Sequence, residues 1–135
     1  MSLENAGSAL YSVLTGGTAL VGKLGGTAIY NRLVPQGTAC PYVLFFRSAA
    51  TEQNSSPRRA RDLIYTVKAV TQDDLKEAED IDVEIDTLLH GAALTITGWG
   101  NYWTARETDI SYLELGAAGV IYYHVGAQYR VRIAE

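Results

Sequence analysis

The chain is poor in the residue types that build disulfides, metal sites and basic nucleic-acid surfaces. A single cysteine, Cys40, cannot form an intrachain disulfide and indicates a reducing compartment. The two histidines, His90 and His124, show no zinc-type spacing with each other or with cysteine, so no zinc site is expected. Lysine and arginine number 11 against 15 acidic residues, and the net charge of -4 argues against a wholly basic nucleic-acid-binding surface.

Long apolar runs are also lacking. No stretch reaches the roughly 18 apolar residues of a transmembrane helix. The first residues lack a basic region followed by an apolar core, so we expect no signal peptide and synthesis in the cytoplasm. The remaining composition is globular, with 47% hydrophobic and 19% charged residues among 135. A chain of this size predicts a single domain, residues 1–135, which buries about two-thirds of its unfolded surface.

Residues 62–91 combine a strand period with a helix period. Apolar side chains first alternate with a period of two, at Leu63, Tyr65, Val67 and Ala69. They then recur at spacings of three and four, at Leu75, Ala78, Ile81, Ile85, Leu88 and Leu89. We expect Thr71 and Asp74 to form a capping box and His90-Gly91 to close the helix. The acidic residues of residues 73–86 are expected to form its solvated face.

The other segments predict further helices and strands. Residues 2–14 have a helical pattern, a helical turn is expected at 18–21, and a short strand at 27–31. Residues 42–47 are apolar on both faces, which suggests that a second layer or another chain covers the face away from the helices. Residues 94–99, 102–115 and 120–133 have strand character, the last with a long alternation that suggests an edge able to pair with another subunit.

This order predicts an α+β fold: a largely antiparallel mixed sheet with two main helices packed on one face. Residues 33–41 are expected to be a loop. Residues 50–61 lack periodicity and contain a proline, so we expect a mobile loop there. Gly98, Gly100 and Asn101 suit a turn or a bulge between two strands, and residues 116–119 suit a turn.

No motif in the chain requires an enzyme or a cofactor. Residues 17–24 have the spacing of a phosphate-binding loop, but Leu24 stands where a magnesium-binding hydroxyl is required, so a glycine-rich connector is the better interpretation. Cys40 precedes Pro41 in a loop and is read as structural, although pairing with a histidine is an alternative. Trp99 and Trp103 either pack the sheet or serve an interface.

Two polar groups are candidates for binding another protein. Three arginines gather at the end of the expected loop, either as solvated surface or as a contact for an acidic partner. The last strand carries a polar face. The candidate interface residues are Gln53, Asn54, Arg58, Arg59, Arg61, Tyr122, His124, Arg130 and Arg132.

The order and hydrophobic pattern of several segments point to a known family. These segments are Leu10-Tyr11-Ser12-Val13-Leu14, Ala19-Leu20-Val21-Gly22, Ala28-Ile29-Tyr30, Val34-Pro35-Gln36-Gly37, Pro41-Tyr42-Val43, residues 63–69, Leu88-Leu89-His90-Gly91 and Tyr129-Arg130-Val131. In this arrangement the chain resembles the tail completion proteins of long-tailed bacteriophages and prophages, which include tail terminator and tail-to-head joining proteins.

The resemblance implies a structural virion protein located at the head–tail junction. Its subunits would form a ring, typically a hexamer, that caps the tail tube and meets the head-completion or connector protein. DNA would pass through the channel without specific binding. Two alternatives are another head-completion or tail-tube component, and a small cytoplasmic binding module or enzyme with a cleft lined by Tyr65, Trp99 and Tyr123.

Overall fold

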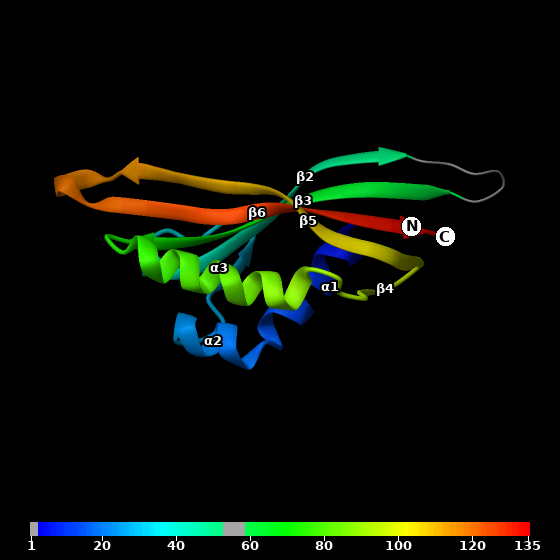
Figure 1. Ribbon diagram of the computed structural model, residues 1–135, viewed down its shortest axis with the longest axis horizontal. Helices are drawn as coiled ribbons and strands as arrows, with labels where there is room; N and C mark the ends of the chain where they lie inside the picture. Colours follow the sequence, from blue (N-terminus) through cyan, green and yellow to red (C-terminus); the bar gives the residue numbers. More distant parts are fainter. Residues whose placement is uncertain (1–2, 53–58) are drawn as a thin grey trace.

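The computed structural model describes residues 3–52 and 59–135, which form one sheet with helices on one side (Figure 1). The helices are α1 (Glu4–Thr15), α2 (Thr18–Leu24) and α3 (Leu75–Leu89). The strands are β1 (Ile29–Asn31), β2 (Tyr42–Glu52), β3 (Ala60–Gln72), β4 (Thr95–Ile96), β5 (Trp99–Leu115) and β6 (Ile121–Ala134). A short 3₁₀ turn, η1 (Ala117–Gly119), joins β5 to β6.

The sheet has the strand order β1-β2-β3-β6-β5-β4. Only β1 and β2 are parallel, and every other neighbouring pair is antiparallel. The predicted α+β class with a mixed, largely antiparallel sheet is therefore confirmed. The helical layer is larger than expected, because the predicted turn at residues 18–21 is the helix α2, which packs beside α3.

The last strand lies in the middle of the sheet, so its interpretation as an edge strand was wrong. Strand β6 pairs with β3 on one side and with β5 on the other. Tyr129, for example, lies opposite Tyr65 of β3 and opposite Arg106 of β5. The alternation of β6 indicates that one face is buried, but it carries no information about how many neighbours the strand has.

The core lies between this sheet and the helices, as the two periods predicted. On β3 the alternating residues Leu63, Val67 and Ala69 are fully buried. They face the apolar side of α3, where Ile81 and Ile85 have no exposed surface. Burial of such side chains contributes about 1.5–3 kcal/mol each to folding, so this interface supplies much of the stability.

Helix α3 begins later than predicted. Its N-cap is Asp74, whose carboxylate accepts a hydrogen bond of 3.0 Å from the Glu77 amide. Thr71 lies within β3, and its hydroxyl donates to the Asp74 carbonyl at 2.6 Å. The predicted capping box at Thr71 was therefore wrong by three positions, whereas closure by His90 and Gly91 is confirmed. Gly91 takes the left-handed conformation, with φ of 77°.

Two hairpins extend beyond the helical layer at opposite ends of the sheet (Figure 1). At one end, β2 continues to Glu52 after a β-bulge between Arg47 and Ala49, and β3 begins at Ala60, so residues 50–52 and 60–61, predicted as loop, belong to strands. At the other end, β5 and β6 are joined through η1.

The strand predicted at residues 94–99 is reduced to the two residues of β4. The turn lies between Ile96 and Trp99 and includes Gly98, as predicted, while Gly100 and Asn101 belong to β5, where the predicted bulge follows Asn101. Among the described residues, no helix is both long and apolar enough to cross a membrane.

Candidate interaction surfaces

The face of the sheet away from the helices presents side chains in cross-strand rows. One row runs across four strands through Tyr42, Val70, His124 and Tyr112. The next row contains Leu44, Lys68, Gly126 and Ile110. The expectation that β2 is apolar on both faces is met, since Val43 and Phe45 are buried on the helix side while Tyr42 and Leu44 alternate with them. We call this side of the sheet the helix-free face.

An aromatic cluster occupies one end of the helix-free face. The rings of Tyr112 and His124 stack with centroids 4.5 Å apart and planes 6° apart. The ammonium of Lys68 donates to the Tyr112 hydroxyl at 2.6 Å and lies 5.1 Å from the ring centroid. His124 Nε2 lies 3.0 Å from a Glu114 carboxylate oxygen. Burial lowers the pKa of His124, which favours a neutral ring near pH 7.

A charged cluster occupies the other end of β6. Its centre is Asp62, only 1% exposed, which lies between Arg130 at 2.9 Å and Arg132 at 3.4 Å. Arg130 also donates to Glu107 of β5 at 2.8 Å, and the Arg132 guanidinium lies 5.8 Å from the Trp103 ring centroid. These contacts join β3, β6 and β5, while Trp103 remains 52% exposed.

The predicted interface residues that the structure describes fall into separate groups. Tyr122 and His124 lie at one end of β6, and Arg130 and Arg132 at the other, about 20 Å away at roughly 3.3 Å per residue. Arg59 and Arg61 lie on the β2–β3 hairpin, where both pair with Glu52, Arg61 at 3.1 Å. Gln53, Asn54 and Arg58 lie outside the described residues. The interface role of all nine stays a prediction.

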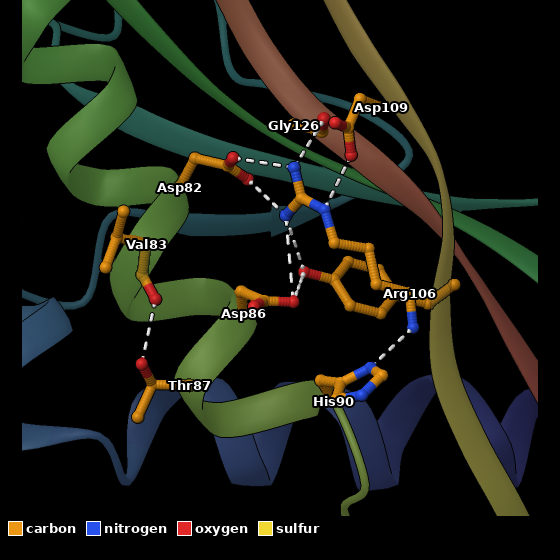
Figure 2. Close-up of polar contacts among 9 residues, drawn as sticks. Asp82, Val83, Asp86, Thr87, His90, Arg106, Asp109 and Gly126 are labelled. Carbon is orange, nitrogen blue, oxygen red and sulfur yellow. Dashed lines mark hydrogen bonds and ion pairs between the residues drawn. The ribbon is translucent and has the colours of Figure 1, made fainter.

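A polar network in the seam between α3 and β5 was missed by sequence reasoning (Figure 2). Arg106 of β5 binds Asp82 of α3 through both terminal nitrogens, at 3.1 and 2.8 Å. The same guanidinium donates to the Tyr129 hydroxyl at 3.2 Å, and that hydroxyl donates to Asp86 at 3.3 Å. The Arg106 amide donates to His90 Nδ1 at 3.1 Å.

This network corrects the reading of α3 as having a wholly solvated acidic face, because Asp82 is 9% exposed and ion-paired. The hydrogen bond to Asp82 raises the pKa of Arg106 further, so its guanidinium stays charged. Burial raises the pKa of Tyr129, which keeps its hydroxyl protonated. The available signal was that Asp82 and Asp86 directly follow the core residues Ile81 and Ile85, so they lie at the edge of the buried face.

The residues considered for the alternative enzyme or binding-module interpretation do not form one site. Tyr65 lies opposite Tyr129, whereas Tyr123 lies opposite Thr71, six positions further along β3, so they do not line one cleft with Trp99. Burial raises the pKa of Cys40, which disfavours a reactive thiolate. Residues 18–24 are helical, and a Cβ at Gly17 would lie 2.4 Å from the Leu88 side chain, so this glycine serves close packing.

The described part of the chain is an α+β sheet with helices on one side and polar clusters that join its strands and helices, and comparison with known proteins shows its family. The chain belongs to the tail completion protein gp17 family, which matches residues 8–133. This is a family of structural proteins of phage-like tails, which implies a non-enzymatic role.

Two solved structures share the fold along nearly the whole chain. One, from the virion of a native gene transfer agent particle, has a TM-score of 0.82 and 17% identity, and the match covers 99% of this chain and 100% of that chain. Another has a TM-score of 0.62 and 14% identity, with 97% of this chain and 96% of that chain covered. No curated protein sequence matches.

Proposed function

We propose that this protein is the subunit of a closed ring that caps the finished tail tube and offers a surface to the head-completion or connector protein. The carrying observation is the helix-free face, where apolar and aromatic side chains are left partly exposed while the helices cover only the opposite face. An exposed patch of this kind on a folded domain is typical of a protein–protein contact.

Two further observations support the proposal. The family is one of tail completion, and a fold relative that spans the full chain is part of a gene transfer agent virion. A ring built from identical subunits uses heterologous contacts that close, so a subunit can be monomeric in solution and assembled on the tail. The net charge of -4 favours passage of DNA through the channel over its capture.

The test is assembly with and without tail tubes. The purified chain is measured by light scattering across a range of concentrations and imaged by negative stain, alone and after addition of polymerised tail tubes. We expect closed rings with a channel as wide as a DNA duplex, either free or at tube ends. A chain that remains monomeric and leaves tube ends bare contradicts the proposal and favours the small binding module.

A further inference from the structure

The outer edge of β5 is open along its distal half. Among the described residues, β4 pairs with β5 only at Trp99 and Gly100. The segment that follows α3 covers a short stretch beyond, where the Gly91 amide donates to the Thr104 carbonyl at 2.7 Å and the Arg106 amide to His90. From residue 107 to residue 115, β5 is exposed except at Ile110, which is partly buried.

The same strand concentrates exposed apolar surface. Of the nine large hydrophobic side chains reported as exposed in the described part of the chain, five lie on β5. They are Tyr102, Trp103, Tyr112, Leu113 and Leu115. An open strand edge with exposed apolar side chains pairs readily with a strand of another chain.

A second open edge lies on the opposite side of the sheet. Strand β1 pairs with β2 at Val43, Leu44 and Phe45, and the Arg32 amide adds a bond to the Phe45 carbonyl at 2.8 Å. Beyond the bulge, no described strand flanks the outer side of β2, and residues 48–52 are exposed.

The two open edges are complementary in direction. Because β2, β3, β6 and β5 alternate in direction, β2 and β5 run antiparallel within the sheet. We propose that β5 of one subunit pairs antiparallel with the distal half of β2 of a second copy, so that the sheet continues from subunit to subunit. The contact joins two different edges, and is therefore heterologous, which is the type of contact that closes a ring.

Charge favours the same pairing. The distal half of β5, residues 107–115, carries three acidic residues and no basic one, a net charge of -3, along the edge that would be donated. The opposite side is basic: β2, β3 and the adjoining Arg59 carry four basic and two acidic residues, a net charge of +2. Opposite net charges on the two meeting sides favour head-to-tail contact of copies and oppose contact between like edges.

The hydrogen bonds already present indicate which amides point outward. On β5, Thr104 and Arg106 bond away from β6, and the bulge between Arg106 and Thr108 inserts one residue. Alternation then directs the amides of Asp109, Ser111 and Leu113 outward. On β2, Val43 and Phe45 bond towards β1, and the same reasoning across its bulge directs the amide of Ala50 outward.

Proline at an outward position removes a donor for the neighbouring copy without removing a bond within the subunit. Ser111→Pro and Ala50→Pro are compared with Ser111→Ala and Ala50→Ser, which retain the amide. This test rests on the proposed ring. We expect both controls to form rings and both proline variants to remain folded monomers.

Mixing the two proline variants sharpens the test, because each retains one intact edge. An equimolar mixture should give a dimer of twice the 14.6 kDa chain mass, and nothing larger. If both proline variants form rings, or if Ala50→Pro alone forms dimers through β5, the strand pairing is wrong while ring formation stands. If the wild-type chain forms no ring even on tail tubes, the proposed function fails together with this contact.

A second measurement covers the case in which a proline variant fails to fold. Hydrogen exchange of the wild-type ring is compared with that of the wild-type monomer. We expect exchange to slow about tenfold or more in the peptides spanning residues 109–113 and 50–52. Unchanged exchange at both segments overturns the proposal, and slower exchange confined to other segments also overturns it.

Discussion

The two faces of the sheet differ in how completely their side chains are covered. On the helix side, Val67 and Ile85 have no exposed surface, and Asp82 of α3 is ion-paired with Arg106 of β5. On the helix-free face, Tyr112 and Trp103 are 46% and 52% exposed although they are large and apolar. The comparison teaches that one face holds the subunit together while the other is left available for neighbours, so substitutions on the two faces should separate stability from assembly.

The largest expected effect is on the helix side. Ile85→Asp places a charge in a site with no exposed surface, and should destabilise the fold by more than about 4 kcal/mol, which is enough to unfold a marginally stable domain. Circular dichroism and chemical denaturation measure this. Val83→Asp on the same helix, where the side chain is 60% exposed, is the control and should melt like the wild type. A cooperatively folded Ile85→Asp variant would show that α3 does not bury this residue.

The next largest effect on the free energy of unfolding is expected at Gly126 of β6, which lies close to the backbone of β3. A Cβ at Gly126 would lie 2.1 Å from the Val67 carbonyl oxygen, so Gly126→Ala should cost about 3 kcal/mol in the free energy of unfolding. Gly22→Ala is the matched control, because no atom lies within 4 Å of that Cβ and alanine favours the helix. Thermal melts should shift down for the first and slightly up for the second. Equal melting temperatures contradict the close approach.

Loss of the ion pair between α3 and β5 should have a smaller effect on the free energy of unfolding. Arg106→Met leaves the buried carboxylate of Asp82 unpaired, which should destabilise the fold by about 2 kcal/mol in urea titrations. Combining it with Asp82→Asn should cost less than the sum of the two single changes, since the pair acts as a unit. Arg32→Met breaks only the exposed pair with Glu4 and should be near neutral. Strict additivity at Arg106 and Asp82 is the contradicting result.

On the helix-free face, a smaller effect on stability is expected from a change of pH, through His124. Burial lowers the pKa of His124 below its ordinary 6.5, so the unfolded chain binds the proton more readily. Stability should therefore fall as the pH decreases through and below 6.5, and His124→Phe, which retains an aromatic ring beside Tyr112, should flatten this dependence. Melting temperatures between pH 7.5 and 5 measure it. A His124→Phe variant with the same slope as the wild type contradicts the prediction and assigns the titration to another group.

The smallest effect on stability is expected from substitutions between β2 and β3. Replacement of Arg58 and Arg59 by Glu, of which Arg59 has a half-exposed side chain, should leave the melting temperature within about a degree while impairing tail or head joining. The readout is the fraction of tail tubes that become capped and joined. Arg32→Glu, also exposed, is the control. Normal joining by the double variant shows that these arginines are only solvated surface.

The strand and helix residues on the helix-covered face of the sheet were predicted well, because side chains that are buried on one side of an element recur with the period of that element. The alternation on β3 and the spacing of Ile81 and Ile85 are direct consequences of burial on one side, so the central strand and helix were identified correctly. The turn of the β5–β6 hairpin at residues 116–119 was predicted correctly, whereas the end of β2 was predicted as a loop, because it projects beyond the helices and no core imposes alternation on residues such as Ala49 and Ala50.

The polar clusters were harder to predict. Asp62 and Arg130 are 68 residues apart and meet only because β3 and β6 are neighbours. Arg106 and Asp82 meet across a helix–sheet seam whose geometry depends on the same strand order. Sequence periodicity specifies a face of an element, but not its neighbours, and the placement of β6 in the middle of the sheet was the missing information.

That placement also sets the order of events during synthesis. Strands β3 and β5 both depend on β6 for their shared ladder, and β6 is the last of them to leave the ribosome. Until it has emerged, the sheet is split and the core cannot close, because the pairing joins distant parts of the chain. A prematurely ended product therefore lacks the structure on which every contact surface described above depends. Such a truncated chain is expected to be absent from assembled particles.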